Sequence, residues 1–346
     1  MDVDLSKDSF RIPYALRRVP RERLARLLAV PRSPQAGDIA LARLESIGKN
    51  TRLELASGRP SHLHVGDRLA VVFGNRYATT QFEGYAGANG DACDLLSMAG
   101  VCGVLASKHE KMLDPSRLRL LGAIGDADSR ALRLQEFALP PIAQRNLPRV
   151  VAICGSDMDA GKTHTAMSTI LGLRNGNQRV AAVKLTGTAA GRDAWAMRDA
   201  GAEPALDFVD GGYSSTYLRS LDELLGLHRL LVAHASAHGT EWVVIEIADG
   251  PLQRETAALL QSPPFTETVD AWLFAASDPL AAAGGIELLR RWHIEPLALS
   301  GLLTMSPLGM REASAVTGLP CVTAAELARG ALNERLAEAR RPVAVS

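Results

Sequence analysis

A glycine, a lysine and a threonine in succession, Gly161 to Thr163, constrain this 346-residue chain more than any other feature. They follow an apolar run, Arg149 to Gly155, and they precede a stretch with helical spacing. A strand, a glycine-containing turn and a helix opened by Gly-Lys-Thr form the context of a phosphate-binding P-loop. The usual motif also has a glycine about five places before Gly161. Ser156 stands at that position, and the glycine comes one residue earlier, at Gly155.

This stretch predicts a nucleotide-binding loop. Lys162 is expected to reach the β- and γ-phosphates, and Thr163 to offer its hydroxyl to Mg²⁺. Backbone N–H groups at the start of the helix would cradle the phosphate oxygens. The alternative is an ordinary helix start with a chance lysine. The predicted nucleotide-binding residues of the loop are Gly155, Ser156, Asp157, Met158, Asp159, Ala160, Gly161, Lys162, Thr163 and His164.

The chain changes character between Glu136 and Val150, where three prolines in a polar stretch indicate a linker. The region before it is rich in short β-type runs bounded by Gly, Asn and Asp, which favours a small antiparallel barrel or sandwich. These runs are Gly37–Gly48, Thr51–Gly58 and Gly66–Gly74. We also expect a helix over Pro20–Val30, and a helix followed by a strand within Asp91–Ser107.

After the linker, nearly continuous apolar runs alternate with helical stretches. This alternation predicts a doubly wound α/β domain with a mostly parallel sheet, since parallel strands are buried on both faces. The predicted strands are Arg149–Gly155, Arg179–Gly187, Glu241–Gly250, Asp270–Ser277 and Leu299–Met305. We therefore expect a smaller β-rich, barrel-like domain (residues 1–140), a linker (141–148), a P-loop domain (149–330) and a C-terminal helix or tail (331–346).

The displaced glycine is shared with a known family. The stretch GSDMDAGKT, Gly155 to Thr163, resembles the loop of dethiobiotin synthetases, GTDTxVGKT, in which the first glycine is also one residue early. The stretch from Val180 to Met197 is similar to that family's second strand, with its lysine and the Asp-bearing helix that follows. The strand from Glu241 to Gly250 resembles the one that ends in EGAGG. The resemblance spans residues 149–327 and leaves the first 148 residues uncovered.

The resemblance implies roles for individual residues. Lys184 matches a lysine near the transferred phosphate, and Asp193 and Glu246 match carboxylates that hold Mg²⁺ together with Thr163. Asp193 also fits a helix N-cap, and the two interpretations remain open. We expect Lys162, Lys184 and Asp159 to be the catalytic residues. The loop from Thr304 to Leu308 would approach the base, which adds Thr304 to the nucleotide site, although a surface loop explains it equally well.

These features favour an enzyme that uses ATP and Mg²⁺ to phosphorylate a small-molecule carboxylate or carbamate and then forms an amide or a ring. The alternatives are a nucleotide switch, such as a metal-insertion or partition ATPase with a partner-binding N-terminal domain, and a small-molecule kinase. Ile247 and Asp249 replace small residues of the family turn, so we expect a different substrate. The glycine-rich stretch Gly74–Asp91 could bind that substrate or a partner, but a β-hairpin loop explains it better.

Charge and composition limit the partners and the compartment. The 38 basic residues balance the 38 acidic ones, and aromatic residues make up only 5% of the chain, which argues against a nucleic-acid binder. The N-terminal stretch has no apolar signal region, and no apolar run is long enough to span a membrane. The four cysteines form no CxxC pair. We expect a reduced cytoplasmic protein, and the resemblance implies a homodimer.

Overall fold

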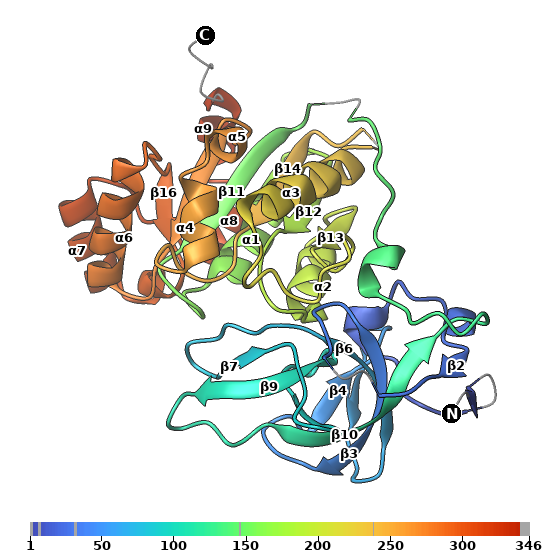
Figure 1. Cartoon of the computed structure of the whole chain (residues 1–346). Coiled ribbons are helices and arrows are strands. Elements are labelled where there is room, and N and C mark those ends of the chain that lie inside the picture. The colour runs from blue at the N-terminus through green and yellow to red at the C-terminus, as the bar shows by residue number, and fades with distance from the viewer. Residues whose placement is uncertain (1–2, 6–7, 31–32, 145–146, 238, 340–346) are drawn as a thin grey trace. The chain divides into compact units, whose positions relative to one another are not determined.

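The computed structural model describes residues 3–5, 8–30, 33–144, 147–237 and 239–339. The chain divides into two compact units, coloured mainly blue to cyan and green to red in Figure 1. Unit 1 contains Met1–Pro140 together with two later segments, Gly187–Arg192 and Phe208–Leu218. Unit 2 contains Pro141–Thr186, Asp193–Asp207 and Arg219–Ser346. The end of the predicted C-terminal tail, residues 340–346, lies outside the described residues.

Unit 1 is built from short strands whose pairing closes on itself. Strand β10 pairs with β3, β3 with β6, β6 with β9, β9 with β8, and β8 again with β10. All these pairs are antiparallel except β6 with β9. The elements are β1 Val3–Asp4, β2 Arg26–Leu27, β3 Ile39–Ser46, β4 Arg52–Glu54, β5 Pro60–His62, β6 Arg68–Phe73, β7 Phe82–Tyr85, β8 Ala92–Leu95, β9 Val101–Lys108 and β10 Ser116–Gly125, with 3₁₀ turns at Tyr14–Leu16, Arg21–Arg23 and Leu134–Phe137.

Alternation along these strands places apolar side chains on the inside of the closed circuit. Ala40, Ala42 and Leu44 of β3 lie in one buried cluster with Val71 of β6 and Leu118 of β10. Cys93 and Cys102 are buried in the same cluster. The three predicted β-type runs are confirmed as β3, β4 and β6.

Both helices predicted in this region are wrong. Within Pro20–Val30 the chain forms a 3₁₀ turn and then β2, where Leu27 is paired with Ile124 of β10. Within Asp91–Ser107 the first element is the strand β8, which lies between β10 and β9. In both places, hydrogen bonding to distant strands overrides a locally helical pattern.

Unit 2 contains a six-stranded parallel sheet with the order β13-β12-β14-β11-β15-β16, which confirms the predicted α/β layout. The strands are β11 Arg149–Gly155, β12 Val180–Lys184, β13 Ala205–Asp207, β14 Trp242–Glu246, β15 Ala271–Ala275 and β16 Ala298–Ser300. The helices are α1 Lys162–Asn175, α2 Gly191–Asp199, α3 Leu221–Ala235, α4 Arg254–Leu260, α5 Pro263–Thr266, α6 Pro279–Arg291, α7 Pro307–Thr317, α8 Ala324–Ala328 and α9 Asn333–Glu338, with a 3₁₀ turn at Leu302–Met305.

Both faces of this sheet are covered by apolar contacts. On one face, Val151 and Ile153 of β11 share a buried cluster with Ile170 of α1 and Leu327 of α8. On the other face, a Cβ built on Gly285 of α6 would lie 2.2 Å from Phe274 of β15, so this helix lies directly on the sheet. Burial on both sides explains why the strands are apolar without alternation.

Side-chain caps fix where several of the helices begin. Ser220 accepts from the N–H of Glu223 at the start of α3, and Asp278 accepts from the N–H of Ala281 at the start of α6. Each such cap stabilises a helix by about 1 kcal/mol. Among the residues that the structure describes, no helix combines the length and the apolar character needed to cross a membrane.

Candidate nucleotide-binding site

Three neighbouring strands of unit 2 end in residues predicted for the site. Gly155 is the last residue of β11, Lys184 the last of β12 and Glu246 the last of β14. Lys184 and Glu246 are paired in register, and Glu246 is paired with Ile153 on its other side. Because the strands are parallel, these residues share the carboxyl edge of the sheet, where open α/β sheets build their ligand sites.

The loop between β11 and α1 is held by its backbone. The N–H of Ser156 donates to the carbonyl of Ala275 at 2.9 Å, and Ala160 accepts from the N–H of Leu302 at 3.0 Å. The loop turns through left-handed conformations at Asp159 (φ +66°) and Gly161 (φ +99°). A strand, a turn of this kind and a helix beginning at Lys162 form a P-loop-like unit.

Close packing explains why the early glycine belongs at the end of β11. A Cβ on Gly155 would lie 2.6 Å from the carbonyl oxygen of Ala275 and 2.8 Å from Cγ of Lys162. Gly301, which the sequence analysis did not single out, has φ +89°, and its Cβ would lie 2.3 Å from the carbonyl oxygen of Ala160. A glycine directly after the apolar run of β16 is the signal that could have identified it.

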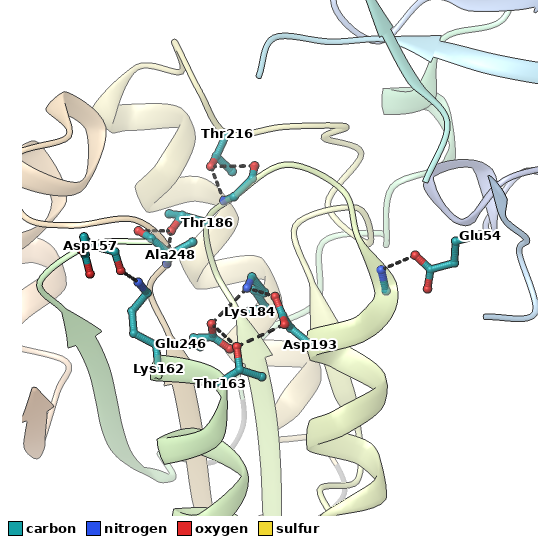
Figure 2. Close-up of polar contacts among 12 residues, drawn as sticks. Glu54, Asp157, Lys162, Thr163, Lys184, Thr186, Asp193, Thr216, Glu246 and Ala248 are labelled. Carbon is teal, nitrogen blue, oxygen red and sulfur yellow. Dashed lines mark hydrogen bonds and ion pairs between the residues drawn. The ribbon is translucent and has the colours of Figure 1, made fainter. Parts of the chain in front are cut away.

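Lys162 is buried, and its ammonium donates to the carbonyl of Asp157 within the loop (Figure 2). Burial lowers the pKa of Lys162, while the carboxylates of Glu246 and Asp249 act in the opposite direction. The ammonium is thus directed into the concave side of the loop, where a phosphate would lie.

Beside the loop, four predicted side chains form one polar cluster, shown in Figure 2. The ammonium of Lys184 lies 3.0 Å from Oε1 of Glu246 and also contacts Oδ2 of Asp193. The hydroxyl of Thr163 lies 2.9 Å from Oε1 of Glu246 and 3.2 Å from Oδ1 of Asp193. The structure therefore brings together every residue that was predicted to hold the metal.

Burial and charge shape the chemistry of this cluster. Burial acts to lower the pKa of Lys184, but the carboxylates of Asp193 and Glu246 outweigh it and raise that pKa above its usual range, so the side chain stays an ammonium. Glu246 is 1% exposed, and burial raises its pKa. Its second oxygen, Oε2, is buried and has no hydrogen-bond partner among the described residues.

This arrangement fits a magnesium ion bound together with a nucleotide. A buried carboxylate oxygen without a donor is a free hard ligand, and Thr163 and Asp193 add two more oxygens beside it. Mg²⁺ in such sites takes one or two carboxylates and completes its shell with phosphate oxygens and water. The described residues contain no group of three or more His, Cys, Asp and Glu that could hold a metal ion.

The remaining predicted residues belong to the loop, to the first turn of α1 or to the segment after β16. Asp157, Asp159 and His164 are exposed, and Ser156 and Met158 are partly exposed. The hydroxyl of Thr304 donates to the carbonyl of Gly301 at 2.8 Å, in the segment whose Leu302 binds the loop backbone. Cys154 is buried beneath the loop, and burial raises the pKa of its thiol to about 12, which makes it a poor nucleophile.

Two side chains of the polar stretch Gly74–Asp91, Gln81 and Glu83, bind other residues of unit 1. Gln81 accepts from Lys49 and Arg76, at 2.6 and 2.7 Å. Glu83 accepts from the hydroxyls of Tyr85 and Ser107, at 2.6 and 2.8 Å. These hydrogen bonds engage Gln81 and Glu83, two of the polar side chains of the stretch Gly74–Asp91.

Comparisons with known proteins give no family for this chain. No protein-family model matches the sequence, and no curated protein matches it. Solved structures with partial similarity include the signal recognition particle 54 kDa protein of Aeropyrum pernix K1 in complex with GDP, with 19% identity and a TM-score of 0.37 over 59% of this chain and 53% of that one. A DUF1611 family protein of Anabaena variabilis has 14% identity and a TM-score of 0.39 over 56% and 58%. Both matches span little more than half of those chains, and TM-scores this low do not establish a shared fold.

Proposed function

We propose that the protein is an ATP- and Mg²⁺-dependent enzyme that transfers a phosphoryl group to a small-molecule carboxylate or carbamate. An amine then attacks the acyl carbon, and inorganic phosphate and a proton leave as an amide or a ring forms. One observation carries the proposal. The lysine of a P-loop-like turn lies beside a polar cluster at the carboxyl edge of a parallel sheet, in which Lys184 and Glu246 are buried and Thr163 and Asp193 are partly exposed.

Phosphoryl transfer needs positive charge around the migrating group more than it needs a covalent nucleophile. Lys162 and Lys184 would supply that charge. Thr163, Asp193 and Glu246 would hold Mg²⁺, which would neutralise charge that develops on the phosphates during the transfer. An oxygen of the acceptor bonds to the γ-phosphorus, the bond to the β–γ bridging oxygen breaks, and ADP leaves.

The segment that follows β16 is the proposed contact for the nucleotide base. Leu302, Met305 and Leu308 are exposed apolar side chains around Thr304, and the N–H of Leu302 is bonded to the loop at Ala160. Apolar walls with a few polar groups are typical of small-ligand sites. We therefore retain Thr304 as a proposed neighbour of the nucleotide.

The experiment is a metabolite screen for ADP release with hydroxylamine present. An acyl phosphate reacts with hydroxylamine and loses phosphate, giving a hydroxamate from a carboxylate or a hydroxyurea from a carbamate, whereas a phosphate ester on a hydroxyl group does not react. ADP formed together with one of these products, and lost in Lys162→Ala, supports the proposal. ADP with a stable phosphorylated product indicates a kinase, and hydrolysis stimulated only by another protein indicates a switch. A protein that binds no nucleotide contradicts all three.

A further inference from the structure

The segment Gly187–Arg192, which follows β12 and contains the start of α2, belongs to unit 1. Two of its contacts fix the chain just before the helix. The hydroxyl of Ser97 donates to the carbonyl of Ala189 at 3.2 Å, and the N–H of Ala189 donates to the carbonyl of Ser214 at 2.9 Å. Residues distant in the sequence therefore hold the backbone ahead of Asp193, a member of the polar cluster.

Helix α2 begins at Gly191 with a cap from outside its own sequence. The N–H of Gly191 donates to Oε2 of Glu54 in β4 at 2.9 Å, a contact drawn in Figure 2. Ala189 and Ala190, directly before the helix, have no side chain that could accept this hydrogen bond. A carboxylate at this end of a helix pairs a backbone donor and interacts favourably with the helix dipole. Glu54 thus takes the place of a local N-cap residue.

The backbone of Glu54 is fixed within unit 1. Glu54 is 6% exposed, and its N–H donates to the carbonyl of Met98 at 2.7 Å. The preceding residue, Leu53, is fully buried in the apolar cluster of unit 1 and pairs with Ser61 of β5. A buried side chain on an anchored strand has little freedom to move. Strand β4 therefore places the carboxylate, and the carboxylate fixes the start of α2.

Asp193 lies in the first turn of this helix, two residues after Gly191. Its Oδ1 lies 3.2 Å from the hydroxyl of Thr163, and its Oδ2 contacts the ammonium of Lys184. The first turn of a helix depends on partners for its N–H groups, and it frays when they are lost. Fraying of α2 would move Asp193 away from the cluster, so the cap on Gly191 bears directly on the geometry of the site.

We infer that Glu54 is a positioning residue for the proposed Mg²⁺ site: by capping α2, it holds the carboxylate of Asp193 where the ion would bind. This inference rests on the proposed function and gives a residue of the β-rich region a part in it. Glu54 touches neither the ion nor the nucleotide and acts through Asp193. Its loss should therefore weaken nucleotide binding that depends on Mg²⁺ and leave binding of the nucleotide alone unchanged.

The test compares Glu54→Met, which fills the same space without a strong acceptor, with Glu54→Gln, whose amide oxygen still accepts from Gly191. Calorimetry measures the affinity for a non-hydrolysable ATP analogue with and without Mg²⁺. In Glu54→Met we expect the affinity with Mg²⁺ to fall by about tenfold, as when a residue that orients a metal ligand is lost. The affinity without Mg²⁺ should not change. Glu54→Gln should lose much less, because a neutral acceptor keeps the hydrogen bond.

Further variants separate this role from a general effect on folding. Glu54→Asp keeps the charge but withdraws its oxygens by one methylene, so it should show the same Mg²⁺-specific loss, and it replaces Glu54→Met if that variant does not fold. Ala190→Ser, added to Glu54→Met, supplies a local N-cap and should restore part of the affinity. Glu45→Ala, which removes an exposed carboxylate of β3, is the control and should behave as the wild type.

Three results would overturn the inference. The first is an equal affinity with Mg²⁺ in the wild type and in the variants that lack the cap. The second is an equal loss with and without Mg²⁺, which would make Glu54 a purely structural residue. The third is a loss in Glu54→Gln as large as that in Glu54→Met, with no recovery by Ala190→Ser. A wild type that binds no analogue, or binds it independently of Mg²⁺, refutes the proposed function instead.

Discussion

Lys184 and Glu246 face each other at the ends of two adjacent parallel strands, with the ammonium 3.0 Å from Oε1. The ion pair occupies one oxygen of Glu246 and leaves Oε2 buried without a partner among the described residues. The lysine therefore neutralises a buried carboxylate and occupies one of its oxygens. In our proposal, the other oxygen binds Mg²⁺.

Glu246→Gln removes the free hard oxygen while keeping the shape of the side chain. We expect the Mg²⁺ concentration for half-maximal ATP turnover to rise by about tenfold or more. Loss of a metal ligand, or of a residue that orients one, lowers metal affinity by about this factor. Asp193→Asn is expected to act in the same direction. Titration of Mg²⁺ at fixed ATP measures the effect. Glu287→Gln, on the exposed side of α6, is the control. Full Mg²⁺-dependent turnover in both site variants would show that the metal lies elsewhere.

Lys184→Met leaves two carboxylates close together without their cation. Removing one partner of a buried pair costs about 3 kcal/mol or more in free energy of unfolding. The double variant Lys184→Met/Glu246→Gln should recover part of that loss, since the remaining buried charge is reduced. Urea denaturation of Lys184→Met, Glu246→Gln and the double variant gives the three unfolding free energies that the double-mutant cycle compares with the wild type. Strictly additive losses would mean that the contact between Lys184 and Glu246 contributes nothing.

Lys162→Ala removes the ammonium that donates into the loop. We expect ATP turnover to fall by at least about 100-fold, because charge stabilisation of the transferring phosphoryl group is lost. The fold should remain intact, since alanine is a good helix former at this position. Lys111→Ala, an exposed residue of unit 1, is the control. Retention of nucleotide binding and hydrolysis in Lys162→Ala would end the P-loop interpretation.

Gly161→Ala tests the conformation of the loop. The residue has φ +99°, and its Cβ would lie 2.9 Å from Cα of Gly301, so we expect both nucleotide affinity and thermal stability to fall. Gly284→Ala in α6 provides the contrast, because nothing lies within 4 Å of its Cβ. That variant should be stabilised by about 0.5–1 kcal/mol through helix propensity. Similar melting temperatures for the two variants would contradict the close packing of the loop.

His228 makes the stability of unit 2 depend on pH. Burial lowers its pKa from 6.5 to about 4, and its ring packs edge-on against Phe265. Below pH 6.5 the imidazole is protonated in the unfolded chain, whereas in the folded chain it stays neutral down to about pH 4. Stability is therefore lost as the pH falls through this window. The loss is on the order of 3 kcal/mol. The melting temperature should fall less between pH 7 and pH 4 in His228→Gln than in the wild type. An equal fall in both proteins would exclude this histidine as the cause.

The sequence alone predicted those features that depend on residues close together in the chain. The glycine at Gly155, the Gly-Lys-Thr sequence and the uninterrupted apolar runs identified the loop, its helix and four of the six strands of the parallel sheet. The run Leu299–Met305 was predicted as a fifth strand, but β16 ends at Ser300 and a 3₁₀ turn follows from Leu302. These features can be predicted because each local structure requires its own residue pattern. Examples are a turn that admits only glycine, a helix start and a strand covered on both faces.

The tertiary structure decided what depends on pairing between distant segments. Residues within Pro20–Val30 and Asp91–Ser107 form strands because they hydrogen-bond to β10, which no local pattern reports. Sequence similarity suggested Asp193 as a metal ligand or a helix cap, and its distance from Thr163 became known only with the fold. The strained backbone of Asp249 and the unpartnered oxygen of Glu246 likewise appear only after packing. Sequence specifies which chemical groups are present, whereas burial and register fix which of them meet and which remain available to a ligand.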